Sequence, residues 1–439
     1  MPLCSAVLAS LNNRALAAYA AAALPLAAAA LPVYVHAPKF YSGLGLDLAL
    51  IGILLLAVRV LDAVSDPLLG LLADRMPERW GGRKAMLVAA VPVIAVGMIL
   101  LFHPPTDGSG LVWWLVLSLI LVYLGLSAAS ISYFALGSAW SRDYAERTRI
   151  TAARGAAALV GVLLAAALPE WLAQQYGAAA GLGLFSIAYT PLLMAGVALT
   201  VLAGPQVVAT VVPRPLLMRE VLRPLRNPRF VRLAAIFLVN GVAAAIPATL
   251  VLFYVADVLQ RPDLTAVFLV LYFIAGAAGM PGWVRIAAHI GKARAWLLAM
   301  LLAVTAFTSA WFLGPGDVTA FAIICVLSGL AFGADLALPA SLLADVIDDD
   351  EGRDGRPDGA YFGFWHLLEK LALALTAGLA LPLLQALGYV PGVVADAGSA
   401  LSWVYALLPC VIKLAAALML WLFAPESGRA KPLFRGDAS

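Results

Sequence analysis

Twelve runs of about 20 mostly apolar residues recur along the chain, and they restrict the fold more than any other feature. A helix needs roughly 20 such residues to cross the hydrocarbon core of a bilayer. The chain is 63% hydrophobic and 12% charged, whereas a soluble domain carries about 25% charged residues. We therefore predict an all-α polytopic membrane protein. The expected transmembrane helices are residues 16–35, 46–72, 85–102, 111–140, 150–171, 182–203, 230–256, 264–286, 295–313, 318–343, 361–387 and 401–423.

Basic residues lie almost entirely on one side of this predicted topology. The chain ends and the connections after even-numbered spans hold most of the 28 Lys and Arg residues, while the opposite connections hold Lys39 and Arg261. Cytoplasmic loops are enriched in Lys and Arg, so we expect an even number of spans and two cytoplasmic termini. A bacterial inner membrane is the expected location. The net charge of +3 gives no indication of nucleic acid as a partner.

The longest connection divides the chain near its middle. Residues 204–229 contain five prolines and several arginines, and we predict a cytoplasmic linker there. It is either an amphipathic helix on the membrane surface or plain chain. The linker separates an N-terminal six-helix bundle, residues 1–203, from a C-terminal one, residues 230–439. Two six-span halves around a midplane binding site are the architecture of major facilitator transporters.

Two carboxylates and one arginine lie within the second predicted span. Asp62 and Asp66 are four residues apart, and Arg59 precedes Asp62 by three, so all three share one helix face. Pro67 interrupts the backbone hydrogen bonds and can leave carbonyl oxygens available. Because charges inside a membrane are costly and usually functional, we interpret this face as a site for Na⁺ or for a proton. The alternative is that Arg59 merely neutralises Asp62 and holds helices together.

Further intramembrane charges lie in the last three predicted spans. His366 and Lys370 share a face of the eleventh span, and Lys370 is the natural counter-charge to the acidic face of the second. His366 is either a cation ligand or a packed, hydrogen-bonded histidine. Glu369 is expected to pair with Lys413 of the twelfth span. Asp335 of the tenth span either contacts solute or bonds to a neighbouring helix.

Three stretches together resemble the glycoside–pentoside–hexuronide cation symporters, the melibiose-permease-like branch of the major facilitator superfamily. They extend over essentially the whole chain, in the order and topological positions of that family. They are Arg59-Val-Leu-Asp62-Ala-Val-Ser-Asp66-Pro67 with Arg79-Trp80-Gly81-Gly82-Arg83-Lys84; Tyr133-Phe134-Ala135-Leu136 with Asp143-Tyr-Ala-Glu146-Arg147-Thr148-Arg149; and Ala344-Asp345-Val-Ile-Asp348-Asp-Asp350-Glu351 with Gly359-Ala-Tyr361-Phe-Gly363-Phe-Trp365 and Gly388-Tyr389-Val-Pro391.

The resemblance implies roles for several residues. Asp62 and Asp66 match the paired cation-site carboxylates of the second helix. Lys370 matches the eleventh-helix lysine that couples that site to solute, and His366 stands where the family has a hydroxyl. Basic and acidic residues near the cytoplasmic side match an ionic gate that would open during alternating access. These gate residues are Arg147, Asp345, Asp348 and Arg356.

The solute-binding residues depart from the sugar transporters of the family. Arg154 resembles a sugar-contacting arginine of the fifth helix, although it could equally anchor lipid headgroups. Ser130 stands where relatives carry an acid, and residues 20–30 contain none. Tyr133 and Trp365 are candidates for stacking on a solute ring. The scarcity of polar solute-binding residues argues against a classical disaccharide as the solute. The lysolipid symporters of the family suggest an amphipathic solute as an alternative. His366 favours the proton over Na⁺.

These observations favour a cation-coupled secondary transporter of a small solute. Sugars or sugar derivatives are the favoured solutes. A primary pump is disfavoured because the sequence has no G-x-x-x-x-G-K-[ST] loop. An enzyme is disfavoured because the four histidines are dispersed. A channel or facilitator would leave the Asp62, Asp66 and Lys370 set without a purpose. We expect no cofactor beyond the coupling ion. The expected partners are the solute, the cation and the bilayer, and we expect the protein to act as a monomer.

Overall fold

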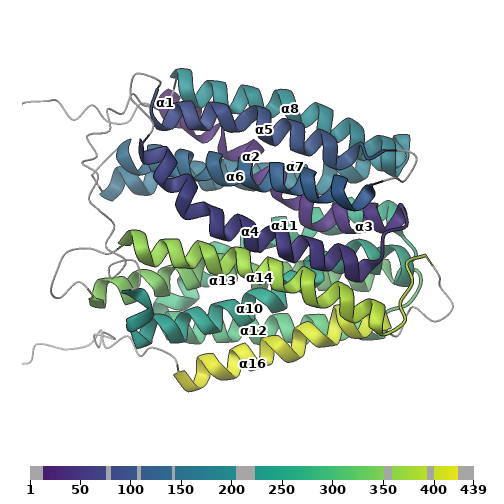
Figure 1. The fold of residues 1–439 in the computed structure, drawn as a ribbon. Coiled ribbons are helices and arrows are strands. Elements are labelled where there is room, and N and C mark those ends of the chain that lie inside the picture. Colours follow the sequence, from purple (N-terminus) through teal and green to yellow (C-terminus); the bar gives the residue numbers. More distant parts are fainter. Residues whose placement is uncertain are drawn as a thin grey trace, which may run out of the picture. The chain divides into compact units, whose positions relative to one another are not determined.

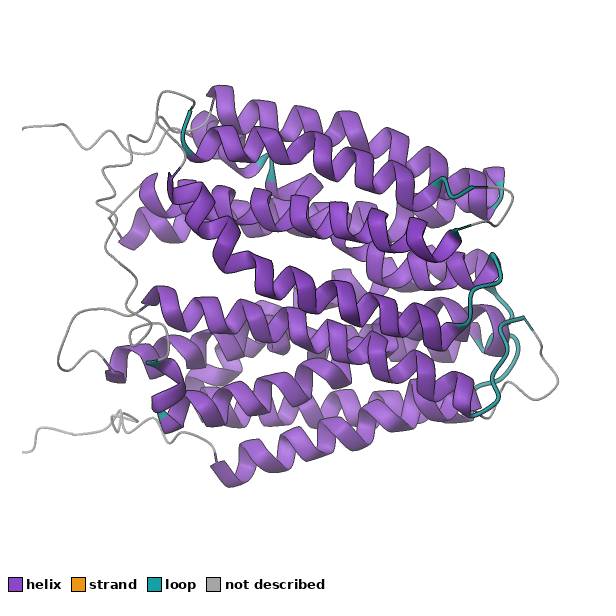
Figure 2. Ribbon diagram, in the orientation of Figure 1, coloured by secondary structure: helices purple, strands orange, loops and turns teal. Residues whose placement is uncertain are grey.

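The computed structural model describes residues 13–75, 81–105, 110–140, 144–203, 223–350, 358–392 and 400–423. Helices account for nearly all of this described chain, and short loops join them (Figure 2). Twelve stretches within these ranges are long and apolar enough to cross a membrane. The predicted all-α polytopic architecture is therefore confirmed.

The chain forms two compact units, Met1–Arg214 and Pro215–Ser439. The division falls within the segment that the sequence predicts as a linker. Residues 204–222 of that segment lie outside the described part of the chain. The exact bounds of the two bundles and of the linker therefore stay predictions.

Unit 1 contains six spans, the first of which is built from several short helical pieces (Figure 1). α2 packs against α7, α5 packs along α6 and α8, and α4 packs against α6. The elements of this unit are α1 (Asn13–Ala20), α2 (Ala23–Leu31), the π-helix η1 (Pro32–His36), α3 (Ala37–Gly43), α4 (Leu48–Arg75), α5 (Arg83–Phe102), α6 (Leu111–Trp140), α7 (Tyr144–Tyr176) and α8 (Ala178–Ala203).

The first span is interrupted between α1 and α2 because Pro25 has no backbone N–H to continue the helical ladder. Thr200 of α8 compensates at this break. Its hydroxyl lies 2.9 Å from the carbonyl oxygen of Ala18 and accepts a bond from the Ala22 N–H at 3.2 Å. Gly161 of α7 allows close contact with α2, since a Cβ there would lie 2.0 Å from the Leu24 carbonyl oxygen. Small residues commonly permit such approaches between membrane helices.

Unit 2 contains the other six spans, and its core is a cluster of aromatic and aliphatic side chains that includes Phe230, Trp296 and Tyr361. α10 packs against α14 and α16, and α11 packs along α13. The elements of this unit are the short η3 (Pro224–Arg226), α10 (Pro228–Phe253), η4 (Tyr254–Val258), η5 (Pro262–Leu264), α11 (Thr265–Ile290), α12 (Lys292–Thr308), η6 (Ser309–Phe312), α13 (Val318–Asp350), α14 (Asp358–Ala386), η7 (Trp403–Leu407) and α16 (Leu408–Phe423).

Several helices extend beyond the spans predicted from apolar content. α7 begins at Tyr144 rather than residue 150, and α13 continues to Asp350 rather than residue 343. Both extensions are polar. A helix can continue past the hydrocarbon core into the headgroup region, where apolar content no longer marks it. The extension of α13 carries the acidic residues Asp345 to Asp350 on a helix.

Candidate functional site

Asp62 is a buried carboxylate of unit 1. It lies on α4 and is 2% exposed. Ser127 of α6 donates a hydrogen bond of 2.6 Å to its Oδ1 atom, and the Nη1 atom of Arg59 lies 3.5 Å from its Oδ2 atom. A carboxylate at this depth requires such partners, because burial of an unmatched charge is very costly.

Arg59 is itself largely buried, with a side chain 13% exposed. Its guanidinium carbon lies 4.0 Å from the centre of the Tyr123 ring, in a cation–π arrangement. The arginine therefore contacts both an aromatic face and a carboxylate, and its contact with Asp62 is the one that the alternative interpretation of the sequence expected. Asp66 follows one turn later on the same face and is half-buried. With both carboxylates ionised, Arg59, Asp62 and Asp66 together carry one net negative charge.

Ser127 is a site residue that the sequence reasoning missed. Ser130, which the sequence indicated, lies one turn further along α6 and is half-buried. The two serines share a face of the helix, and the solute-binding role expected for Ser130 stays a prediction. The choice between them depends on the rotation of α6 about its axis, and only the hydrogen bond to Asp62 decides it.

A second group of candidates, Tyr133 and Arg154, meets elsewhere in unit 1. The rings of Tyr19 and Tyr133 stack at 4.6 Å, and each hydroxyl donates to the other residue's backbone carbonyl oxygen. The Arg154 guanidinium lies 4.4 Å from the centre of the Phe134 ring. Trp140 also contacts Tyr19. We call Tyr19, Tyr133, Phe134, Trp140 and Arg154 the aromatic cluster. It combines ring faces with one positive charge.

Asp335 lies at a polar junction of four helices in unit 2. Its Oδ1 atom accepts bonds from Asn240 of α10 at 3.0 Å and from the Trp296 indole of α12 at 2.7 Å. Lys413 of α16 lies 2.9 Å from its Oδ2 atom, and both side chains are about one-tenth exposed. The structure thus agrees with the helix-to-helix alternative for Asp335. The expected pairing of Lys413 with Glu369 is wrong, because Asp335 engages that lysine.

The candidate site residues on α14 have different surroundings. Trp365 is buried in the core of unit 2 and stacks on Phe237 with ring centres 3.9 Å apart. His366 is exposed and contacts Glu369 at 3.0 Å, which accounts for the glutamate that Lys413 does not bind. Lys370, four residues after His366, is half-buried. The coupling roles of Lys370 and His366 stay predictions.

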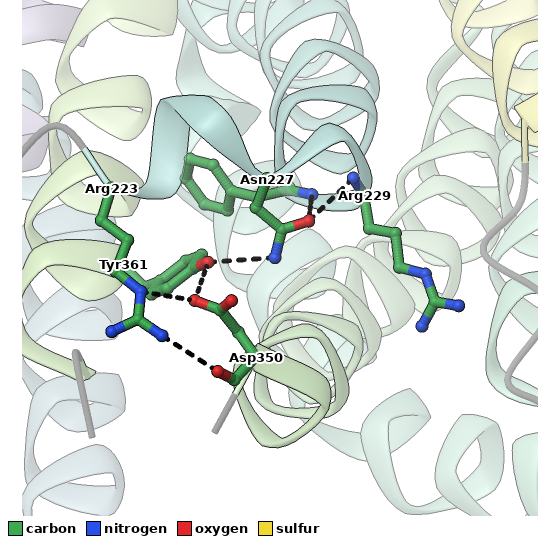
Figure 3. A network of polar contacts seen from close by, with 6 residues as sticks. Arg223, Asn227, Arg229, Asp350 and Tyr361 are labelled. Carbon is green, nitrogen blue, oxygen red and sulfur yellow. Dashed lines mark hydrogen bonds and ion pairs between the residues drawn. The ribbon is translucent and has the colours of Figure 1, made fainter. Parts of the chain in front are cut away.

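Acidic residues at the end of α13 are held by basic residues of unit 2. Lys292 of α12 bonds to Asp345 at 2.6 Å, and Arg223 bonds to both the carboxylate and the backbone carbonyl of Asp350. Tyr361 also donates to Asp350 and accepts from Asn227, which caps α10 (Figure 3). This network ties the residues just before α10 to the ends of α13 and α14.

The predicted gate residues are described only in part. Asp345 has its partner Lys292 within unit 2, and Asp348 is exposed. The side chain of Arg147 and the whole of Arg356 lie outside the described residues. The gate therefore stays a prediction. Among the described residues, no group of three or more His, Cys, Asp or Glu could hold a metal ion.

Comparison with known proteins places these features in a family. The family model described as MFS/sugar transport protein matches residues 16–425. The chain belongs to this family. Its members include the glycoside–pentoside–hexuronide cation symporters of the major facilitator superfamily, as the sequence motifs indicated. The family consists of transporters, not enzymes.

Relatives within the family are similar over most of their length. A glucuronide carrier protein homolog of Escherichia coli (strain K12) is 25% identical over 86% of this chain and 85% of its own. An isoprimeverose transporter of Lactiplantibacillus pentosus is 24% identical, over 80% and 75%. A putative 2,3-dihydroxypropane-1-sulfonate exporter of Salmonella typhimurium is 27% identical, over 88% and 86%.

Solved structures agree on the fold. The nucleoside transporter NupG superposes with a TM-score of 0.69 at 14% identity, over 93% of this chain and 99% of its own. A bacterial homolog of the human lysosomal transporter Spinster superposes with a TM-score of 0.67, also at 14% identity, over 94% and 95%. The major facilitator fold expected from two six-span halves is therefore confirmed.

Proposed function

We propose that this chain is a cation-coupled secondary transporter that moves a sugar or sugar derivative by alternating access. Asp62 and Asp66 would be the carboxylates that bind the coupling cation. The supporting observation is the buried Asp62 carboxylate, bonded by Ser127, with a second carboxylate one turn away and one arginine beside them. Carboxylate and hydroxyl oxygens are ligands for hard cations.

The coupling ion is a proton or Na⁺, and we favour the proton. Two carboxylates on successive turns repel each other when both are ionised, so the pair can hold one proton between them. Lys370 and His366 would then take part in coupling from the eleventh span. Binding of the cation would alter the affinity for solute, and binding of solute would alter the affinity for the cation to the same degree.

For the solute, the aromatic cluster of unit 1 supports a sugar derivative that carries an acidic group. Phe134, 39% exposed, offers a ring face beside the buried Tyr19 and Tyr133, and Arg154 offers a guanidinium that suits a carboxylate or sulfonate. Relatives are named for a glucuronide and for a dihydroxypropane sulfonate. Ser130, Asp335 and Trp365 would contribute less, since Asp335 and Trp365 are buried against their own unit. The alternatives are a lysolipid or other amphipathic solute and, less favoured, an uncoupled facilitator.

The remaining features of the proposal follow from charge distribution. Both termini and the arginine-rich connections would face the cytoplasm of a bacterial inner membrane, in accordance with the positive-inside rule. Arg147, Asp345, Asp348 and Arg356 would form a gate on that side. For Asp345 this requires an exchange of partner, because Lys292 now holds it. The protein would act as a monomer.

The experiment is uptake by purified protein in proteoliposomes, with the solute first identified by a thermal-shift screen of sugars, sugar acids and lysolipids. Asp66→Asn should abolish uphill uptake while the folded protein is still obtained. Asp47→Asn is the matched control, since Asp47 is exposed and precedes the same helix α4. Uphill uptake by Asp66→Asn equal to that of Asp47→Asn would refute the cation site. Uptake by the wild type that an ionophore leaves unchanged would refute coupling itself.

A further inference from the structure

A buried histidine and a largely buried glutamate meet in unit 1, and neither belongs to a site described above. His36 ends the π-helix η1 of the first span, and Glu170 lies near the end of α7, directly after Pro169. The His36 side chain is 3% exposed and the Glu170 side chain 14%. The Nε2 atom of His36 lies 3.2 Å from the Oε1 atom of Glu170.

The contact has the distance of an ion pair but not the geometry of a hydrogen bond. Both ring nitrogens of His36 are buried, and neither has a hydrogen-bond partner within the described part of the chain. A buried polar atom without a partner costs about 1–3 kcal/mol. Short π-helical segments are frequent at functional sites, and η1 is the segment that carries the imidazole.

The described elements that pack most closely on η1 carry few charged residues near His36. η1 packs against α2, α3 and α7. Of these, α2 has no charged residue, α3 contributes Lys39, which acts electrostatically on Glu170, and α7 contributes Glu170 itself. The other charged residues of α7, from Glu146 to Arg154, lie near its opposite end. Arg59 acts on Tyr34, two residues before His36 and on another side of the helix.

Glu170 and Lys39 therefore balance each other when ionised, and His36 supplies a group that can be neutral or positive. Histidine is the side chain that changes charge near physiological pH. A neutral imidazole donates from one nitrogen only, whereas an imidazolium donates from both. Protonation would turn the present 3.2 Å contact into an ion pair, and a small rotation of the ring would complete a charge-assisted hydrogen bond, which is stronger than a neutral one.

We propose that His36 and Glu170 form a binding site for one proton in unit 1, separate from Asp62 and Asp66. The proton adds to the imidazole ring, and the resulting imidazolium donates to the Glu170 carboxylate; no other bond is made or broken. The site lies at the end of α7 that finishes at Tyr176, opposite to the end that begins at Tyr144. Protonation there fastens the first span to the fifth.

The test is a histidine titration by NMR, which needs neither a solute nor transport. The chain has four histidines, so protein labelled with ¹⁵N-histidine in nanodiscs gives a small set of signals, and His36→Gln identifies that of His36. We expect the His36 signal to change from the neutral to the protonated form between pH 8 and pH 5. In Glu170→Gln its proton affinity should fall at least tenfold.

His366 is the internal control, because it contacts Glu369 in an exposed pair. Glu170→Gln should leave the His366 titration unchanged, and Glu369→Gln should leave that of His36 unchanged. A His36 signal that stays neutral down to pH 5, or one whose midpoint Glu170→Gln does not move, would overturn the proposal. If Glu170→Gln does not fold, the wild-type titration alone decides. Failure here leaves the role of Asp62 and Asp66 untouched, since that role rests on uptake.

Discussion

Each unit contains a buried aspartate, and the partners of the two differ in kind. Asp335 in unit 2 is bonded by nitrogen donors from three other helices, and Lys413 balances its charge. Asp62 in unit 1 accepts a bond from the Ser127 hydroxyl, lies 3.5 Å from Arg59 and has Asp66 one turn away. Nitrogen donors cannot bind a cation, whereas hydroxyl and carboxylate oxygens can. The same residue type therefore forms a structural junction in one unit and fits the proposed cation site in the other.

The largest expected effect concerns the structural junction. Lys413→Met removes the counter-charge of Asp335 and leaves a buried carboxylate, so unfolding should become easier by about 3–5 kcal/mol. Thermal unfolding in detergent, followed by loss of the monodisperse peak on size-exclusion chromatography, measures this. The double variant Asp335→Asn, Lys413→Met should be more stable than Lys413→Met alone, since it removes both charges.

The comparison with unit 1 makes that experiment decisive. Asp62→Asn should reduce stability much less than Lys413→Met, because asparagine still accepts the bond from Ser127 and removes a charge from a face with a negative surplus. Its cost should appear in cation-driven uptake instead. If Asp62→Asn proves as destabilising as Lys413→Met, the two aspartates serve the same structural purpose, and the distinction between the units fails.

A smaller effect tests Ser127. A hydrogen bond to a charged group contributes about 1.5–3 kcal/mol, so Ser127→Ala should change the cation affinity about tenfold or more. The affinity for Na⁺ should fall, because a hydroxyl ligand is lost, whereas that for a proton should rise, because the bond that favours ionised Asp62 is gone. The measurement is the cation concentration that gives half-maximal uptake at saturating solute. Ser127→Thr keeps the hydroxyl and should retain most of the affinity. Ser130→Ala should affect solute affinity alone, and an equal change in cation affinity in that variant would mean that Ser127 has no special role.

These residues show how far the sequence could lead. Membrane spans are predictable because apolar content along one helix suffices to define them, and the positions of Asp62, Asp66 and Arg59 on one face follow from helical spacing. The pairing of Lys413 is different, since Asp335 and Glu369 were both in reach by sequence. Which one it meets depends on how α13, α14 and α16 are rotated about their axes, and helix rotation is set by packing against neighbours.

The contact between His36 and Glu170 is likewise one that the sequence alone does not predict. The two residues are far apart in sequence, and each alone is an ordinary residue near the end of a span. Their meeting depends on the π-helix η1, which shifts the register of side chains within the first span. No spacing rule along the sequence marks such a shift. Pairwise contacts between spans are therefore what the structure adds to the sequence.

The smallest expected effect lies at a polar contact between the end of a span and a loop. Tyr389 follows Gly388, whose φ of 81° turns the chain after α14, and its hydroxyl donates to Asp257. Tyr389→Phe should lower the free energy of unfolding by only about 1 kcal/mol, because Asp257 also accepts a bond from the Gly392 N–H. This is less than for Lys413→Met, since no charge is left without a partner.

The difference in the free energy of unfolding between the wild type and Tyr389→Phe should depend on pH, and this dependence identifies its cause. Burial, together with the bond to the Asp257 carboxylate, raises the pKa of the Tyr389 hydroxyl above its ordinary value of 10.0. The folded protein therefore retains the proton that the unfolded chain loses, so the contribution is complete below about pH 10 and declines as the pH rises further. Unfolding of wild type and Tyr389→Phe should be compared from pH 8 to pH 11. The other tyrosines are common to both proteins, so a difference that stays constant above pH 10 would show that the hydroxyl is not held by Asp257.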